Sequence, residues 1–520
     1  MIDTVALREK VLDLAIRGKL VPQDPNDEPA SVLLERIRAQ KQQMVKDGKL
    51  KVKDIKDDSI IFVGEDNLHY EKFADGTVKC IEDEIPFELP EGWSWERLSN
   101  LASFSGGKTP STSKREYWEG NILWVTSKDM KCKYIDSSLL MISEKGLEQM
   151  QLYPENTLLL VTRSGILRHT IPVAILKKPA TINQDLKAIM LYIPNLEEYI
   201  YICIKGMESR LILEYTKAGA TVENINFDAF QKILLPIPPE NQIQRIIDAT
   251  NDTDEVIGKL KTDQEDLIDI IDKTKSKILD LAIRGKLVPQ NPDDEPASVL
   301  LERIRAEKKE LIKAGKIKRD KKESVIFKGE DNSYYDEIPK NWAMTTLNQL
   351  THALLLNDGD WILSENMNPQ GEVKLIQLGS VGMMQYVDKG FKYLAENTFQ
   401  ELNCTQIYSG YMLINRIVSD KMCSCILPSI EGKLITTVDT CWVAPKKEWY
   451  NLKYLMYTLS SPTFQSLVML NSAGTTRKRI SKNNLINLPF AVPPLEEQYR
   501  IVEAIDNAFN QLDTIAESLN

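Results

Sequence analysis

The chain has 520 residues, of which 42% are hydrophobic and 27% charged, the composition of an ordinary soluble globular protein. Its 24 glycines and 24 prolines exclude a collagen-like or low-complexity chain. At roughly 150 residues per domain, the length predicts about three to four domains. The first 22 residues contain no apolar signal-peptide core, and no later run approaches about 18 apolar residues, so we expect a cytoplasmic protein.

The net charge of −10 argues against a general polyanion binder, but basic residues gather locally. Residues 36–56 hold eight Lys/Arg against two acids, and residues 303–322 hold ten against three. The seven cysteines form no C-x-x-C pair and have no histidine at zinc spacing. We therefore expect reduced, structural thiols.

The chain repeats itself. Residues 12–39 recur at residues 279–306 with 26 of 28 positions identical. A weaker match at an offset of 255 links Ile225 with Ile480 and the Pro-Pro pair at 238 with the pair at 493. The chain is therefore a tandem duplication, and its second half is 12 residues shorter than its first.

The segments between the matching parts, residues 88–235 and 338–490, show little identity to each other. Both contain short β-rich runs, such as residues 157–165 and 411–419, interrupted by Gly, Pro and Asn turns. We expect a mixed α/β domain in each half.

The repeated parts predict long helices. Twelve positions from Ile243 to Leu281 step alternately by three and four residues, and eight of them are apolar. They predict a helix of roughly 40 residues, about 60 Å long. The same spacing runs from Ile501 to Leu519 and continues from Leu7, so the two chain ends together rebuild one copy of the central helix. We expect an α+β fold with two mixed α/β domains separated by a long antiparallel helical coiled-coil spacer, with circular pseudo-two-fold symmetry.

A further helix is expected after the turns at Asp24-Pro25 and Asn291-Pro292. Pro29 and Pro296 fall near its first turn, where a missing N–H costs nothing, and Gly48 and Gly315 suit the position after its end. Its basic continuation is either a solvated helix face or a contact for protein or phosphate.

The sequence contains fragments of catalytic motifs but no complete one. Residues 107–109 resemble the end of a phosphate-binding loop, but Ala102 occupies the position of its first glycine. Residues 487–490 resemble an amino-methyltransferase motif with leucine at the second position, and residues 431–433 have nuclease-like spacing without a second carboxylate. A binding protein is therefore favoured over an enzyme.

Several segments resemble the specificity subunit of type I restriction-modification enzymes: the doubled frame at 12–39 and 279–306, the segments 236–246 and 492–502, and residues 91–120. The resemblance covers essentially the whole chain. It implies two target-recognition domains that each recognise one half of a split DNA sequence, and two helical regions that set the gap and bind two modification subunits. It also implies that adenine methylation, ATP-driven translocation and cleavage belong to partner subunits.

The resemblance suggests domain boundaries, which are residues 1–56 for an N-terminal helical region that joins the C-terminal helix, 88–235 for the first target-recognition domain, 240–322 for the central helical region, 338–490 for the second target-recognition domain and 495–520 for the C-terminal helix. The second recognition domain departs from the pattern at its start. It keeps Trp342 and Leu347 but shows no counterpart of the segment from Gly106 to Tyr117.

DNA recognition requires cations for phosphates and forked or amide donors for base edges. Polar, basic loops in the two variable domains supply such groups, whereas aromatic residues there also fit a packing role. The residues expected to contact DNA are Thr109, Ser111, Thr112, Ser113, Lys114, Arg115, Tyr117, Arg163, Lys217, Thr221, Arg416, Thr475, Thr476, Arg477, Lys478, Arg479 and Lys482.

We therefore expect a non-catalytic DNA-specificity subunit without cofactor or metal sites. Its expected partners are double-stranded DNA, two modification subunits and restriction subunits, with S-adenosylmethionine, ATP and Mg²⁺ bound only by those partners and no membrane contact. The expected location is the cytoplasm of a bacterium or archaeon, at the nucleoid. A coiled-coil scaffold or regulatory subunit that binds only proteins is an alternative, and a self-sufficient methyltransferase or nuclease would need a site that the sequence lacks.

Overall fold

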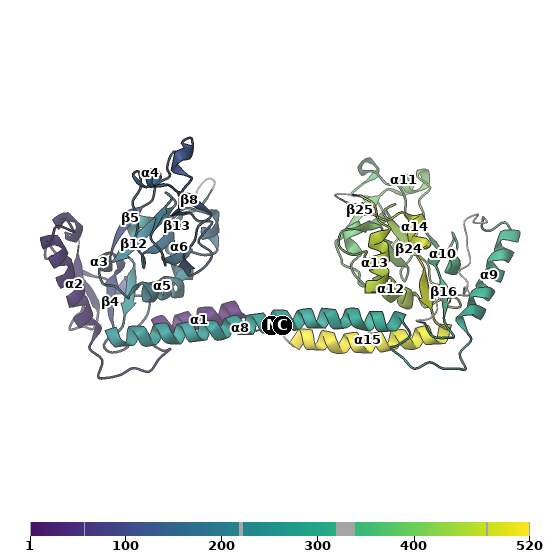
Figure 1. Ribbon diagram of the computed structural model, residues 1–520, viewed down its shortest axis with the longest axis horizontal. Helices are drawn as coiled ribbons and strands as arrows, with labels where there is room; N and C mark the ends of the chain where they lie inside the picture. The colour runs from purple at the N-terminus through teal and green to yellow at the C-terminus, as the bar shows by residue number, and fades with distance from the viewer. Residues whose placement is uncertain (1, 57, 218–221, 319–337, 475–476, 519–520) are drawn as a thin grey trace. The chain divides into compact units, whose positions relative to one another are not determined.

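The computed structural model describes residues 2–56, 58–217, 222–318, 338–474 and 477–518. The chain forms two compact units, Ile2–Asp263 and Gln264–Asn520. The boundary falls within one helix, α8 (Glu240–Ile283, 44 residues), so that each unit contains one half of α8 (Figure 1). The predicted helix of roughly 40 residues is confirmed.

In the first unit, α1 (Thr4–Ile16) lies antiparallel along the N-terminal half of α8 (Figure 1). Asp3 caps α1 by accepting hydrogen bonds from the backbone N–H groups of its first turn, at 2.9 and 3.0 Å. Arg8 Nε lies 2.7 Å from Asp254 Oδ1 on α8. The next helix, α2 (Ala30–Lys46), begins directly after Pro29 and ends before Gly48, whose φ of 71° is the left-handed conformation that a glycine in this position adopts readily.

The second unit repeats this frame. Helix α15 (Leu495–Ser518) lies antiparallel along the C-terminal half of α8, where Lys275 forms an ion pair with Asp513 (Figure 1). Helix α9 (Ala297–Lys313) corresponds to α2. All twelve predicted seam positions of α8 are buried or half-buried. The predicted antiparallel helical packing along α8 is therefore present in each unit.

The duplicated frame also repeats an ion pair. Arg245 Nη1 lies 3.4 Å from Asp27 Oδ1, and Arg500 Nη1 lies 3.3 Å from Asp294 Oδ1. Both aspartate side chains are only 5% exposed. The hydrogen bond from Arg245 lowers the pKa of Asp27, because it stabilises the ionised carboxylate. Each pair fixes the turn before α2 or α9 to the helix that leaves the variable domain.

A buried tryptophan contact is repeated with one chemical difference. Trp93 Nε1 donates to Gln242 Oε1, and Trp342 Nε1 donates to Glu497 Oε2, both over 3.0 Å. Gln242 and Glu497 are 0% and 1% exposed. Burial raises the pKa of the Glu497 carboxyl, because the ionised form loses water there. The first unit therefore has a neutral amide where the second has an acid.

The variable part of the first unit contains two larger sheets, with strand orders β5-β12-β9-β10-β7 and β11-β6-β8. The strand bounds are β5 Ala102–Gly106, β6 Ile122–Val125, β7 Tyr134–Ile135, β8 Leu140–Ile142, β9 Leu158–Val161, β10 Val173–Leu176, β11 Ala180–Ile182 and β12 Leu186–Leu191. Smaller pairings join β4 (Ser94–Arg97) to β15 (Leu234–Ile237) and β13 (Thr216–Lys217) to β14 (Asn224–Ile225). The helices are α3 Leu98–Leu101, α4 Glu144–Leu147, α5 Glu197–Gly206, α6 Glu208–Tyr215 and α7 Phe227–Phe230.

Among the described residues, the variable part of the second unit repeats the strand order of the first, except that its larger sheet has no counterpart of the edge strand β7. Its sheets have the orders β17-β24-β20-β22 and β19-β18-β23, and small pairings join β16 to β26 and β21 to β25. The strand bounds are β16 Ala343–Thr345, β17 Leu356–Asp358, β18 Val373–Ile376, β19 Phe391–Leu394, β20 Met412–Asn415, β21 Ile417–Val418, β22 Ser424–Ile426, β23 Leu434–Thr436, β24 Thr440–Val443, β25 Lys478–Arg479 and β26 Phe490–Val492. The helices are α10 Leu347–Leu350, α11 Glu396–Glu401, α12 Leu452–Ser460, α13 Pro462–Leu470 and α14 Lys482–Ile486.

The register of the central strands shows how the two variable parts correspond. Val161 of β9 pairs with Leu186 of β12, and Asn415 of β20 pairs with Thr440 of β24, a constant offset of 254 residues. The four strands that the larger sheets have in common therefore share their order, and the central pair shares its register, although the two sequences have little identity. The predicted α+β fold with two mixed α/β domains is confirmed.

Each variable part shares one hydrophobic core with its frame. In the first unit, Ile16 of α1, Ile37 of α2 and Ile246 of α8 belong to the same buried cluster as Tyr199 of α5. Burial of this apolar surface is the main source of folding free energy. The frame and the sheets of a unit are therefore expected to unfold together.

One element was not predicted. Residues 59–80 form a three-stranded antiparallel sheet of β1 (Ser59–Val63), β2 (His69–Phe73) and β3 (Val78–Cys80), between the predicted helical region 1–56 and the predicted domain 88–235.

All seven cysteines are free thiols, and Cys80 and Cys132 are exposed and not in a core. Across the described ranges, no helix is long and apolar enough to cross a membrane.

Candidate nucleic-acid interface

In the first unit, three parts of the chain meet at one end of the larger sheet, and we call them the first edge: residues 107–118 after β5, the turn 183–185, and the corner formed by residues 162–164 with 216–217 and 222–225. The Lys108 N–H donates to the Ile182 carbonyl over 3.0 Å, and the Thr162 N–H donates to the Asp185 carbonyl over 2.8 Å. The turn 183–185 therefore joins the other two segments, because both are hydrogen-bonded to it or to its flanking residue.

The loop 107–118 contains seven of the residues that the sequence singles out. The Thr109 hydroxyl donates to the Gln184 side chain at the tip of the turn. Ser111 and Ser113 hydrogen-bond to each other over 2.9 Å, and Thr112 is exposed. Lys114 Nζ donates to Tyr117 Oη over 3.2 Å, and this hydrogen bond raises the pKa of the lysine.

The same loop has an internal framework. Trp118 Nε1 donates to the Ser111 carbonyl over 3.1 Å, and its ring packs edge-on against Trp124 with centroids 4.8 Å apart. Arg115 is 89% exposed and pairs with Glu119. The Tyr117 carbonyl accepts from the Ser143 N–H over 3.0 Å, which fastens the loop to α4. The loop therefore presents polar groups outward while its two tryptophans hold its shape.

At the corner of the first edge, two predicted cations lie beside the same strand residue. Arg163 forms a β-bridge with Asn224, and Lys217 pairs with Asn224 in the β13–β14 ladder. Both side chains are exposed. Thr221, also predicted, lies outside the described residues. The structure thus brings Arg163 and Lys217 together from segments about 50 residues apart in sequence.

The second unit has an equivalent edge, formed by residues 359–367 after β17, the turn 437–439, and the corner of residues 416–418 with 477–480. We call this the second edge. The Asp360 N–H donates to the Thr436 carbonyl over 2.9 Å, which corresponds to the bond from Lys108 to Ile182. The Arg416 N–H donates to the Asp439 carbonyl over 2.8 Å, which corresponds to the bond from Thr162 to Asp185.

Two glycines show that the loops after β5 and β17 correspond. A Cβ on Gly107 would lie 2.3 Å from the Ile182 carbonyl oxygen, and a Cβ on Gly359 would lie 2.4 Å from that of Thr436. Only glycine lets the chain pass so close to these carbonyls. The prediction that the second domain has no counterpart of the first loop is therefore wrong. The correspondence could not be seen in the sequence, because only Gly359 matches Gly107. The residues that follow Gly359 do not resemble the polar residues that follow Gly107.

Arg416 does not fit its predicted role. It is 4% exposed, its Nε lies 3.1 Å from Asp358 Oδ1, and its guanidinium donates to the carbonyls of Val438 and Ile480. The sequence match with Arg163 was one residue out of register. In the structure Arg416 corresponds to buried Thr162, and a shift of one residue turns a strand side chain to the opposite face. Arg416 supports the corner from inside.

The other predicted cations, which lie on the second edge or directly beside it, fall into two groups. Arg477 and Lys478 are exposed. Arg479 Nη2 lies 2.8 Å from Asp439 Oδ1, and Lys482 Nζ donates to Asn357 Oδ1 over 2.7 Å. Thr475 and Thr476 lie outside the described residues. Arg477 and Lys478 are thus the cations of this edge whose side chains face solvent most freely.

Comparison with known proteins identifies the family. A family model described as the type I restriction modification DNA specificity domain matches residues 90–267 and 339–520, more than half of the chain. The chain belongs to this family. Its function is therefore sequence-specific DNA recognition in a type I restriction-modification system, as a specificity subunit that is not itself catalytic.

The individual relatives agree with the family model. The type I restriction enzyme EcoEI specificity subunit of Escherichia coli is 25% identical over 577 residues, covering 99% of this chain and 90% of that protein. The EcoAI specificity subunit, also from Escherichia coli, is 28% identical, covering 67% of this chain and 62% of that protein. A chain from a solved type I restriction-modification system has a TM-score of 0.52 at 14% identity, covering 84% of this chain and 94% of that chain, which shows a shared fold.

The charges on the two edges fit contact with a polyanion in a specificity subunit. Within the described part of the chain, Lys108, Lys114, Arg163 and Lys217 on the first edge have no carboxylate in ion-pair contact. The same holds for Arg477 and Lys478 on the second edge within the described ranges. These cations gather locally although the chain as a whole carries −10.

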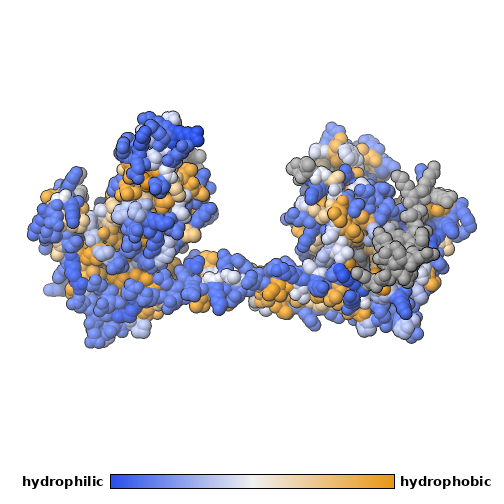
Figure 2. Space-filling view, viewed as in Figure 1, coloured by the Kyte–Doolittle hydropathy of each residue, from blue (hydrophilic) through white to orange (hydrophobic). Residues whose placement is uncertain are grey.

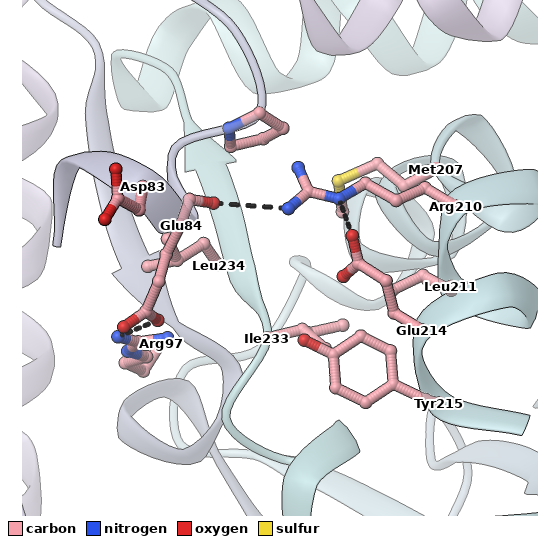
Figure 3. Close-up of a pocket in the computed structure, with 11 residues that line it drawn as sticks. Asp83, Glu84, Arg97, Met207, Arg210, Leu211, Glu214, Tyr215, Ile233 and Leu234 are labelled. Carbon is pink, nitrogen blue, oxygen red and sulfur yellow. Dashed lines mark hydrogen bonds and ion pairs between the residues drawn. The ribbon is translucent and has the colours of Figure 1, made fainter.

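A separate pocket of about 250 Å³ lies in the first unit between residues 83–86 and α6 (Figure 3). Arg97 Nη2 lies 2.7 Å from Glu84 Oε2, and Arg210 donates to the Glu84 carbonyl and pairs with Glu214 at 2.6 Å (Figure 3). Its cations are thus already paired with its acids.

Among the residues that the structure describes, no group of three or more His, Cys, Asp or Glu side chains could hold a metal ion.

Sequence reasoning missed the turns 183–185 and 437–439, and the segment 359–367. Gln184 is an exposed amide at the tip of its turn, but a single Gln between two strands gives no sequence signal. The signal that was available is Gly359, in the run Asn-Asp-Gly-Asp that follows the apolar residues 353–356, since a glycine at the end of a strand often marks close backbone approach.

Proposed function

We propose that this specificity subunit recognises a split DNA sequence, with the first edge contacting one half-site and the second edge the other. The observation that carries the proposal is the repetition of one edge architecture with different side chains on it. The same three segments meet in both units, yet Thr109 and Gln184 of the first are replaced by Trp361 and Val438 in the second. Two such edges on a duplicated frame suit two different half-sites.

Each edge supplies the two kinds of group that DNA recognition requires. The cations Lys114, Arg163 and Lys217, and Arg477 with Lys478, suit phosphates, because guanidinium and ammonium groups neutralise the backbone charge. Thr109, Ser111 and Ser113, together with Gln184, suit base edges in the major groove, where amides and hydroxyls discriminate base pairs. Arg416 is left out of this set because it is buried.

The helical frame is proposed to set the gap between half-sites and to bind the partner subunits. In this proposal α8, flanked by α1 and α15, spaces the two recognition domains, which comprise about residues 88–235 and 338–490. Two modification subunits would bind the duplicated frame, one for each copy, and supply adenine methylation with S-adenosylmethionine. Restriction subunits would supply ATP- and Mg²⁺-dependent translocation and cleavage. Such a complex would act in the cytoplasm, at the nucleoid.

A genome-wide map of methylated adenines tests this proposal. Cells that carry this chain with its neighbouring modification genes are compared with cells from which only this chain is deleted. We expect a motif in two parts with a fixed gap that disappears on deletion. An unchanged map, with the modification subunits demonstrably expressed, would contradict the proposal.

A further inference from the structure

The second edge presents an apolar side chain at the position where the first edge presents polar groups. Counting from the matched glycines Gly107 and Gly359, Trp361 takes the place of Thr109. The matched turns place Val438 where the first unit has Gln184. On the first edge these two positions are in direct contact, through the hydrogen bond between Thr109 and Gln184.

Trp361 is held in place although it is 67% exposed. The residue before it, Asp360, is fixed on both sides of the segment, because the Val438 N–H donates to its carbonyl and the Thr405 N–H donates to its carboxylate, at 2.9 and 2.8 Å. The residue after it, Ile362, packs against the buried cluster of β18, β19 and β23. The alternation of an extended segment then directs Trp361 away from the core.

An exposed tryptophan in a fixed position indicates a contact surface. Leaving a large ring in water forgoes the free energy of burying it, and tryptophan is enriched where interfaces gain most of their binding energy. Leu363, two residues further and on the same side of the extended segment, is 45% exposed. Figure 2 agrees at the level of the surface: hydrophilic residues cover the end of the first unit that carries α4, whereas hydrophobic residues appear on the end of the second unit that carries α11.

The turn beneath Trp361 also contacts the basic corner. Asp439, next to Val438, pairs with Arg479 at 2.8 Å, and Arg479 directly follows Arg477 and Lys478 in sequence. A duplex whose phosphates meet that corner would therefore bring base edges toward this turn and the residue above it. The base edge that offers an apolar group in the major groove is thymine, through its C5 methyl.

We propose that Trp361 is a specificity-determining residue of the second recognition domain, and that with Val438 it contacts the C5 methyl group of a thymine in the second half-site. The inference rests on the proposed function, since it assumes that the second edge contacts DNA. It adds the chemical class of the contact: apolar on the second edge, where the first edge offers an amide and a hydroxyl.

The test uses DNA in which single thymines are replaced by uracil, which removes only the methyl group. Once the methylation map has given both half-sites, each thymine of the second half-site, on either strand, is replaced in turn. Binding is measured with the full-length chain in complex with its modification subunits. The protein is wild type, Trp361→Ala, or Tyr408→Ala, which removes an aromatic ring that is 52% exposed and precedes β20, at the opposite end of the sheet from the second edge.

We expect one uracil to weaken binding of the wild type and of Tyr408→Ala by about fourfold, the value of burying one methyl group. The same uracil should weaken the binding of Trp361→Ala clearly less than it weakens that of the wild type, because one of the two partners of the methyl group is already absent and only Val438 remains. Since Trp361 is exposed, the melting temperature of the variant should equal that of the wild type.

Three outcomes would overturn the inference: no thymine in the second half-site, no uracil that weakens the wild type, or an equal loss with Trp361→Ala. In each of these the wild type still binds its split sequence, so the proposed function stands. Failure of the proposed function appears differently, as the absence of a split motif in the methylation map.

Discussion

The exposed cations of the second edge make a quantitative prediction about salt. Arg477 and Lys478 have no carboxylate in ion-pair contact within the described ranges, whereas Arg479 is paired with Asp439 and Lys482 with Asn357. The double variant Arg477→Ala/Lys478→Ala therefore removes two phosphate contacts without breaking a described side-chain contact. A surface change of this kind should leave the free energy of unfolding within about 0.5 kcal/mol of the wild type.

The magnitude follows from counterion release. Each phosphate contact contributes about 0.9 to the slope of log affinity against log salt, so two contacts change the slope by about 1.8. On raising the salt about threefold, from about 0.1 to about 0.3 M, the wild type should lose about sevenfold more affinity than the double variant. Because phosphates carry no sequence information, the loss should be the same on specific and non-specific DNA.

The assay is equilibrium binding of fluorescent duplex DNA by the full-length chain with its modification subunits, over a series of salt concentrations. The matched control is Lys447→Ala, an exposed lysine that follows β24 at the end of the sheet away from the second edge. Its slope should equal that of the wild type. Identical slopes for wild type and double variant would refute the phosphate role of Arg477 and Lys478.

Three further predictions concern the fold. Gly359→Ala places a Cβ 2.4 Å from the Thr436 carbonyl oxygen, so it should destabilise the protein by about 1–3 kcal/mol in chemical denaturation. In the control Gly379→Ala, the nearest atom to the new Cβ would be Lys389 Cγ at 3.9 Å, so this variant should cost less than about 1 kcal/mol. Burial raises the pKa of Glu497 in the folded protein, so the contribution of its protonated form to stability is greatest below the unfolded pKa and is lost as pH rises through the folded pKa. Glu497→Gln should therefore have a higher melting temperature than the wild type at pH 7 but not at pH 4. An equal difference in melting temperature at both pH values would contradict this. Deleting seven residues within α8 shortens the helix by about 10 Å. The gap between the two parts of the methylated motif should then change by up to about three base pairs. An unaltered gap would show that α8 does not set the distance between the half-sites.

The sequence predicted the frame far better than the interface. The frame could be predicted because 26 identical positions and a seam with a regular period leave little choice of packing partner, and because Gly48 and Gly315 mark where helices end. The shared topology of the variable parts could not be predicted, because a sheet tolerates many apolar sequences as long as buried positions alternate with exposed ones.

The misplacement of Arg416 has a clear physical cause. In a short strand, a match at an offset of 253 and one at 254 look equally good in sequence, yet they place the side chain on opposite faces. The backbone hydrogen bonds fix the register. The Arg416 N–H donates to the Asp439 carbonyl as that of Thr162 donates to Asp185, and the Arg416 carbonyl accepts from Ile480 as that of Thr162 accepts from Ile225. The predictions for Arg163 and Arg477 do not depend on this match, and both side chains are exposed in the structure.

The near-identity of residues 12–39 and 279–306 has a genetic consequence. A crossover between the two coding segments would join residue 11 to residue 279 and remove 267 residues, yet the product would keep α9, the second variable part, α15 and the contacts of Asp294 with Arg500 and Trp342 with Glu497. Because those contacts lie within one unit, the shortened chain is expected to fold, and a cooperative thermal melt of the engineered join would show whether it does. One unequal exchange could thus turn a gene for a chain with two different recognition domains into a gene for a half-length protein with one, which would recognise a symmetric sequence if it paired with itself.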